Sequence, residues 1–390
     1  MAIIPGLRST ADYAAGEINW PFMAEVARYE PFGTLPLTAL MSGIKAKPID
    51  GTKITWRDKS YNNRELLVNA GGLAVSTSGT VQTLPVAANA FLAPAGMMLR
   101  VVRTGEVLRV VTDPTSGTSL SVWRGWGQVT GSATPSIPTG EYVLAYANAS
   151  GQFTLPPSGS SQTPFEQFNH TQIVRTPYGV SKTAEGTSFK DGNALTTEAE
   201  QAAYDHAAEL ELLMLLGRRF DTLGTNSKAL TTMGGIMDFV TTNVYDFGGA
   251  ATRDNILDAG KEIAKFGNTD PWVIGTSDAV SRINQELEGY ANYIMSVGED
   301  AYGYNITKLI MPNNVTWNVL THPMLNATES MSNILFVLSV PDLGRHPLMG
   351  SDTQTRSTTP EGMNATMEEL YTEMTISVRR EKNFGIIRNL

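Results

Sequence analysis

The segment LTTEAEQAAYDHAAELELLMLLGRRFD, from Leu195 to Asp221, is the longest helical pattern in the chain. Thr197 and Glu200 have the spacing of a capping box, in which both side chains satisfy free amides at a helix start. Small and apolar residues then recur every three or four positions and predict one buried stripe: Ala199, Ala203, His206, Leu210, Leu213 and, after a longer step at Gly217, Phe220. About 24 residues at about 1.5 Å each make a helix roughly 36 Å long.

The polar residues of this helix do not suggest chemistry. We expect His206 to be a satisfied, partly buried histidine rather than a ligand, because it lies on the stripe. Glu209 and Glu211 lie off the stripe, and we expect them to face solvent or a neighbouring subunit.

The composition and length of the chain disfavour several classes of protein. The chain has 390 residues, 42% hydrophobic and 17% charged, a net charge of −9 and no cysteine. Its length suggests two or three domains. The acidic balance disfavours a protein that grips nucleic acid through its phosphates. The start lacks the pattern of a signal peptide, and no apolar run approaches the roughly 20 residues that span a bilayer.

The first 48 residues read as an arm. Prolines at Pro21, Pro31 and Pro36 disfavour a packed helix bundle, so we expect at most one short helix, near Phe22–Tyr29. A segment with aromatic residues but no core of its own is stable only when docked elsewhere. We therefore expect the arm to lie across a neighbouring subunit.

Strands and turns dominate the next hundred residues. In TKITWRDKSYNNRELLVN, Ile54 and Trp56 alternate with polar residues as on a half-buried strand. GMMLRVVRTGEVLRVVTDPTSGTSLSVWRGWG then gives short strands broken by turns, which predicts a small β module. The linker SGQFTLPPSGSSQTPF follows, and TQIVRTPYGVSKTAEG resumes the extended pattern.

The second half alternates helices and strands. TRDNILDAGKEIAKFGN predicts a helix capped by Thr252, and SDAVSRINQELEGY predicts one capped by Ser277, with the buried strand PWVIGT between them. YNITKLIMP and VTWNVLTH predict two strands joined by a tight turn at Asn313-Asn314. NILFVLSVPDL reads as a buried strand. The chain ends with an amphipathic strand, on which Met374, Ile376 and Val378 alternate with Thr375, Ser377 and Arg379.

Motifs for chemistry are missing. The sequence has no phosphate-binding loop, no H-E-x-x-H and no G-x-S-x-G, and its four histidines are scattered. We therefore predict no catalytic residues, no cofactor and no metal site. Two rival classes stay open: a β-rich surface adhesin, and an α/β hydrolase-like enzyme built from the second half.

The order of these patterns resembles the major capsid proteins of tailed bacteriophages, which have the Hong Kong 97 fold. EQFNHTQIVRTPYGVSKTAEG resembles the segment before their spine helix, EQAAYDHAAELELLMLLGRRFD the spine helix, and Thr232 to Gly235 the turn after it. WVIGTSDAVSRI and MTISVRREKNFGIIRNL resemble a step of the axial lobe and the C-terminal strand of the peripheral lobe. GEVLRVVTDPTSGTSLSVWRGWG resembles a β insertion found in the extended loop of some members.

The resemblance implies an α+β chain of five parts. These are an N-terminal arm (1–50), an extended loop (51–190) with a small β-barrel-like insertion (about 73–151), a spine helix in the peripheral domain (191–222), an axial domain (223–330) and return strands of the peripheral domain (331–390). The spine helix is then a strut between two lobes, and its function is geometric rather than chemical.

The same resemblance implies a structural protein. We expect pentamers and hexamers that form an icosahedral head around the phage genome, assembled in the bacterial cytoplasm and retained in the virion. Expected partners are further copies of the chain, a portal, a separate scaffolding protein if one is used, minor or decoration proteins, and double-stranded DNA held without sequence-specific contacts. No membrane partner is expected. Candidate intersubunit contacts are Trp20, Phe22, Tyr29, Phe32, Trp123, Arg124, Trp126, Glu209, Arg218 and Arg219.

Overall fold

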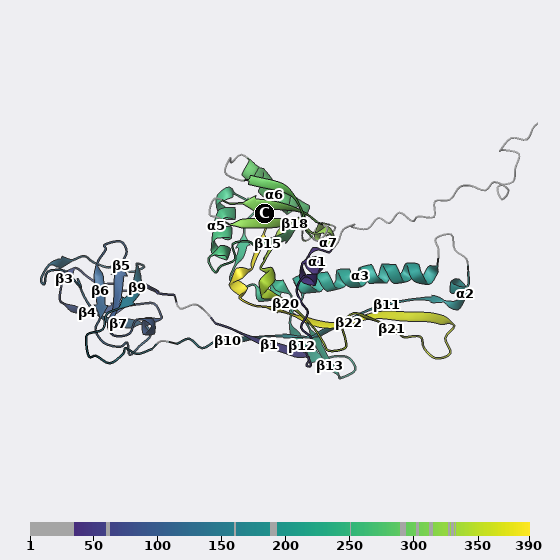
Figure 1. Cartoon of the computed structure of the whole chain (residues 1–390), viewed down its shortest axis with the longest axis horizontal. Coiled ribbons are helices and arrows are strands. Elements are labelled where there is room, and N and C mark those ends of the chain that lie inside the picture. The colour runs from purple at the N-terminus through teal and green to yellow at the C-terminus, as the bar shows by residue number, and fades with distance from the viewer. Residues whose placement is uncertain are drawn as a thin grey trace, which may run out of the picture. The chain divides into compact units, whose positions relative to one another are not determined.

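The computed structural model describes residues 35–59, 63–159, 161–187, 193–249, 251–288, 294–301, 304–311, 315–326, 328, 331 and 333–390 (Figure 1). The chain divides into two compact units. The smaller is Arg57–Glu166, and the larger combines Met1–Trp56 with Gln167–Leu390. Strands dominate and helices are few, so the predicted α+β class is confirmed.

The smaller unit, hereafter the module, is built on an antiparallel sheet. Six strands follow the order β2-β9-β5-β6-β7-β4, and β3 pairs with β8. Alternate residues point inward to a core of Leu, Val, Ile and Ala side chains. The strands are β2 (Glu65–Leu67), β3 (Ser76–Thr77), β4 (Val81–Pro85), β5 (Met97–Val101), β6 (Val107–Val110), β7 (Ser119–Trp123), β8 (Ala133–Thr134) and β9 (Tyr142–Asn148). The sheet therefore begins before residue 73, because β2 pairs with β9.

Two strands lead into and out of the module. β1 (Lys53–Asp58) pairs with β10 (Phe165–His170). Ile54 is half-buried and Trp56 is buried, as their alternation predicts. The Trp56 ring packs on Phe239, with ring centroids 5.5 Å apart.

Helix α3 (Ala194–Leu216), which we expected to be the spine helix, lies along a sheet formed by β11 (Gln172–Ser181), β22 (Ala365–Val378), β20 (Leu343–Pro347) and β21 (Gln354–Ser357) (Figure 1). β11 and β22 pair over ten positions. His206 joins helix and sheet: its Nδ1 is 2.9 Å from the Thr176 hydroxyl and its Nε2 is 2.7 Å from the Thr372 hydroxyl. The prediction of a satisfied histidine is confirmed.

The predicted start of this helix is wrong. Asn193 is the N-cap, and its side chain accepts a hydrogen bond from the Leu195 amide. Thr197 therefore lies inside the helix, where its hydroxyl bonds the Asn193 carbonyl at 3.2 Å. A threonine in this position bonds back to the preceding turn instead of capping.

The predicted stripe is only partly right. Ala203 is exposed, Leu213 is half-buried and Phe220 lies beyond the helix. The buried residues are Ala202, His206, Ala208, Leu210, Glu211, Met214 and Leu215. The burial departs from one stripe because the C-terminal part of α3 also packs against α4 (Ile236–Phe239) and contributes to a core that contains α1 residues.

The second sheet of the larger unit has seven strands in the order β14-β23-β19-β15-β18-β17-β16. They are β14 (Val244–Asp246), β15 (Trp272–Gly275), β16 (Ile294–Ala301), β17 (Tyr304–Ile310), β18 (Thr316–Thr321), β19 (Ile334–Leu338) and β23 (Gly385–Arg388). Residues of α5 (Arg253–Ala264) and α6 (Ser277–Glu288) share one core with this sheet. Other residues of the same sheet share a second core with α1 and α3.

The helix starts in this part were predicted with mixed success. Thr252 caps α5 through the Asn255 amide, as predicted. At α6, by contrast, the Thr276 hydroxyl accepts from the Ala279 amide, so the cap lies one residue before Ser277. The predicted Asn313-Asn314 turn lies outside the described residues.

The amphipathic reading of the last long strand, β22, is wrong. Met374, Ile376 and Val378 are buried as predicted, but Thr375 and Ser377 are buried too. The Ser377 hydroxyl is 2.9 Å from Nε2 of His346, a buried residue of β20. The C-terminal half of the strand is covered on both faces. The buried Ser377 hydroxyl has a hydrogen-bond partner there, whereas the buried Thr375 hydroxyl has none among the described residues.

The described end of the arm does not match its prediction. Helix α1 (Pro36–Ser42) begins with proline at its first position, where the missing amide costs nothing. Leu37, Leu40 and Met41 are buried in the core of their own chain. This part of the arm therefore packs against its own subunit rather than against a neighbouring one. The helix expected near Phe22–Tyr29 lies outside the described residues.

Candidate functional site

The outer face of the module sheet carries exposed apolar side chains. Strand pairing places Val81, Trp123, Arg109 and Met98 side by side on four adjacent strands. Tyr146 extends the row, because its hydroxyl contacts the Met98 sulfur at 3.7 Å. We call this row, together with Trp126, the aromatic strip. Large exposed apolar patches on soluble proteins mark interaction sites.

The two tryptophans of the strip are held in place. Trp123 and Trp126 pack edge to face, with centroids 5.4 Å apart, and are 37% and 36% exposed. The Arg109 guanidinium lies 4.9 Å from the Trp126 centroid. Rigid, half-exposed tryptophan beside arginine is the chemistry of contact hot spots.

Arg124, which the sequence suggested as an exposed contact, is wholly buried. It forms an ion pair with Glu106 at 2.7 Å. It also donates to the side chain of Gln82 and to the carbonyls of Ala74 and Pro135. This guanidinium therefore joins segments inside the module and presents nothing to a partner. It lies inward because its neighbour Trp123 points outward on the same strand end.

The spine helix presents an acidic surface. Glu198, Asp205 and Glu209 are exposed. At 3.6 residues per turn they lie within about 40° of arc on one face. Helix α3 contains no Lys or Arg. The expectation that Glu209 faces outward is confirmed, and we call these three residues the acidic row.

Glu211 was also expected to face outward, and this prediction is wrong. It is fully buried, and its carboxylate accepts hydrogen bonds from the amides of Leu37 and Thr38, each at 2.7 Å. The Thr38 hydroxyl donates to it as well. His322 Nε2 lies 3.2 Å from the same carboxylate without forming an aligned hydrogen bond.

This carboxylate caps α1 from another helix. The N-cap residue of α1 is Leu35, which has no side-chain acceptor, so the first amides need an outside partner. A negative charge at a helix N-terminus is also favoured by the helix dipole. The helical pattern around Glu211 held no signal of this role; the one available clue was Pro36, which favours a helix start.

The two arginines after the spine differ. Arg218 is exposed. Arg219 is half-buried: it donates to the Phe168 carbonyl at 2.5 Å and stacks over the Phe168 ring at 4.4 Å. The Arg219 side chain thus makes these contacts within its own subunit. The arm residues Trp20, Phe22, Tyr29 and Phe32 lie outside the described residues.

A hairpin after the spine was missed from the sequence. β12 (Phe220–Leu223) pairs with β13 (Ala229–Thr232) in a two-stranded sheet. Phe220 is 62% exposed and Leu230 is 51% exposed, and the register puts both on one face. The sequence assigned Phe220 to the buried stripe of α3; the helix ends at Leu216, so that periodicity no longer applies.

In the part of the chain that the structure describes, no group of three or more His, Asp or Glu side chains could hold a metal ion. None of the described helices is long and apolar enough to span a bilayer.

Comparisons place this architecture among known proteins. A family model described as SU10 major capsid protein matches residues 19–390. The major capsid protein of Pseudomonas phage PaMx41 is 25% identical over 270 residues, which cover 67% of this chain and 60% of that protein. The matched region thus spans less than two thirds of the length of that curated relative.

Solved capsid structures are similar as well. The capsid of Myoviridae phage XM1 is 11% identical, with coverage of 97% of this chain and 99% of that chain and a TM-score of 0.48. The capsid of a native GTA particle is 9% identical, with coverage of 98% and 99% and a TM-score of 0.47.

Proposed function

The chain belongs to the SU10 major capsid protein family, and on that premise we propose that its copies assemble as pentamers and hexamers into the icosahedral shell around a phage genome. The observation that carries this proposal is the family match over residues 19–390, which takes in both compact units. The adhesin and hydrolase alternatives receive no support from this match. We assign the chain a structural role and no catalytic one.

The parts of the subunit have proposed roles. Residues 1–50 act as arm, 51–190 as extended loop, 191–222 as spine, 223–330 as axial domain and 331–390 as peripheral return strands. Docking of α1 in its own chain limits the part of the arm that reaches a neighbour to residues before 35. The exposed hairpin face around Phe220 and Leu230 is a further contact surface, because a two-stranded sheet is marginally stable alone.

Charge supports a pairing between the aromatic strip of one copy and the acidic row of another. The module contains seven Lys and Arg and six Asp and Glu, so it carries +1 while the rest of the chain carries −10. Complementary charge steers association and fixes register.

The two surfaces also match in length. The strip crosses five strands, and the four spacings between them at about 4.8 Å each make roughly 19 Å. The acidic row extends over eleven residue steps at about 1.5 Å each, roughly 17 Å. Arg109, Trp123 and Trp126 are the proposed anchors on the module, and Glu209 is the proposed anchor on the spine. Arg218 is exposed, and we propose it as an intersubunit contact without assigning its partner.

The remaining partners follow from the shell. We propose a portal, a scaffolding protein where one is used, and minor or decoration proteins. Double-stranded DNA would lie against the inner face without sequence-specific contacts, and an acidic chain favours such weak adsorption. Assembly would take place in the bacterial cytoplasm, and the shell would persist in the virion.

Assembly is the test. The purified chain should give capsomers, shells or tubes by light scattering and negative-stain microscopy. A chain that stays monomeric at every concentration, with or without scaffold, would end the shell proposal.

Charge reversal tests the pairing separately. Glu209→Lys should weaken assembly, and Arg109→Glu should restore it in the double variant. Glu200→Lys is the matched control, since Glu200 is exposed about 200° around α3 from Glu198. Equal assembly of the Glu209 and Glu200 variants would reject the pairing and leave the shell proposal standing.

A further inference from the structure

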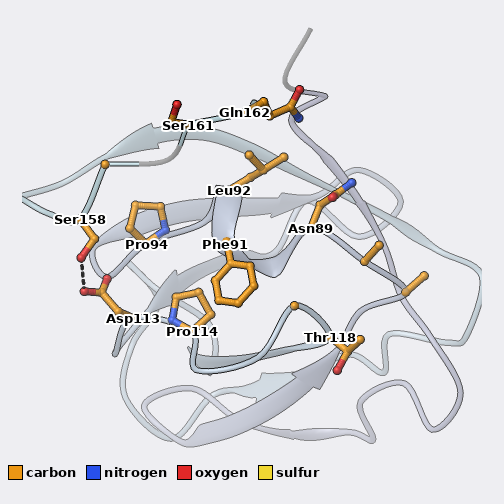
Figure 2. A pocket seen from close by; sticks show the side chains of 14 residues that line it. Asn89, Phe91, Leu92, Pro94, Asp113, Pro114, Thr118, Ser158, Ser161 and Gln162 are labelled. Atoms are coloured by element: carbon orange, nitrogen blue, oxygen red, sulfur yellow. Dashed lines mark hydrogen bonds between the residues drawn. The ribbon is translucent and has the colours of Figure 1, made fainter. Parts of the chain in front are cut away.

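A pocket of about 720 Å³ opens on the module beside the 3₁₀ turn Ala90–Leu92 (Figure 2). The ring of Phe91 lies at its centre and is 56% exposed. Pockets that bind small ligands commonly measure about 300–1,000 Å³ and combine an apolar surface with a few placed polar groups. Phe91 is not part of the module core.

One wall of the pocket is firmly built. Asp113 Oδ1 accepts a hydrogen bond from the Ala95 amide at 2.7 Å, and its Oδ2 accepts from the Ser158 hydroxyl at 2.6 Å. These bonds, the amide first, lower the pKa of Asp113 from its ordinary value, so the group stays a carboxylate. Each oxygen retains a second lone pair for a ligand hydroxyl.

Other polar groups surround the ring. Asn89 and Thr118 lie on the opposite side of Phe91 from Asp113 in Figure 2, and Gln162 lies above. Asn89 has a φ of 65°, the left-handed region that asparagine tolerates better than most residues. Amide, hydroxyl and carboxylate groups therefore border a flat aromatic surface.

The lining disfavours three classes of ligand. It contains one carboxylate and no Lys or Arg, which disfavours phosphates and other anions. It contains a single aromatic residue, whereas grooves for proline-rich peptides are lined by several. Burying a purely apolar ligand here would leave the polar groups unpaired, which costs free energy.

We propose that this pocket binds a neutral oligosaccharide. One pyranose ring stacks its C–H face on Phe91, because the aromatic face is electron-rich and attracts the positive ends of C–H bonds. Sugar hydroxyls donate to Asp113 and exchange hydrogen bonds with Asn89 and Gln162. The module would then attach the protein to a polysaccharide, a function separate from shell formation and independent of it.

Calorimetry on the full-length chain tests this with named probes. Maltohexaose, cellohexaose and chitohexaose are the neutral ligands, and a hyaluronan hexasaccharide and a deca-proline peptide are the comparisons. At least one neutral hexasaccharide should bind saturably. Phe91→Ala should weaken it about tenfold or more, a loss that corresponds to about 1.4 kcal/mol. Phe91→Leu, which keeps apolar bulk without a flat face, should weaken it too.

The matched control is Phe153→Ala. Phe153 is fully exposed on the same module, does not line the pocket, and should leave binding unchanged. Unchanged thermal unfolding shows that the Phe91 variants remain folded. Asp113→Asn should weaken the neutral sugar severalfold. The proposal fails if no neutral probe binds at millimolar concentration, if Phe91→Ala binds as wild type does, or if the anionic sugar or the peptide binds as tightly.

Discussion

Replacing Glu211 by alanine should destabilise the larger unit by about 3–5 kcal/mol, because it leaves donors at the start of α1 unsatisfied at about 1–3 kcal/mol each. The side chain is fully buried and accepts from two backbone amides and one hydroxyl of α1. Hydrogen bonds to a charged group contribute about 1.5–3 kcal/mol each. The loss should be smaller than their sum, because the start of α1 can fray and regain water.

Glu211→Gln separates charge from shape. The amide keeps the volume and one acceptor, but its NH₂ group faces donors. We expect a loss of at least about 2 kcal/mol, the cost of leaving one donor of α1 unsatisfied. Glu200→Ala is the control on the same helix: it is exposed, and surface changes usually stay within about 0.5 kcal/mol.

Urea denaturation followed by tryptophan fluorescence measures these differences. The two units can unfold separately, so the module signal must be removed. Changing Trp123 and Trp126 to phenylalanine does this and leaves four tryptophans as reporters, all in the larger unit and including the buried Trp56 and Trp317. If Glu211→Ala and Glu200→Ala unfold at the same urea concentration, the capping argument is wrong.

Two further predictions concern residues of helix α3. Burial lowers the pKa of His206 from its ordinary value, so the unfolded chain takes up the proton first as the pH falls. Stability should therefore be complete above the ordinary pKa of about 6.5 and decline below it. Urea midpoints at pH 7.5 and 5.5 should differ less in His206→Gln; the difference persists in part because burial shifts His346 the same way. Leu215→Ala should cost about 2–5 kcal/mol, since Leu215 is fully buried, and clearly more than Leu213→Ala at the half-buried neighbour. Equal losses at these two positions would contradict the burial observed.

The sequence by itself determined the class of the fold and several of its elements. The spine helix, the Thr252-capped helix and the strand at Trp272–Gly275 were all predicted, because periodicity and caps are local properties of the chain. The family resemblance was likewise present in the order of these segments, and the family model confirms it.

Only the tertiary structure decided which polar residues serve the surface and which the interior. Glu209 and Glu211 are two positions apart on one helix, yet one faces solvent and the other caps α1. Trp123 and Arg124 are adjacent, yet one is exposed and the other pairs with Glu106. The periodicities of helices and strands predict which residues share a face. Whether that face is covered depends on segments far away in the sequence, here 174 residues for Glu211 and 18 for Arg124.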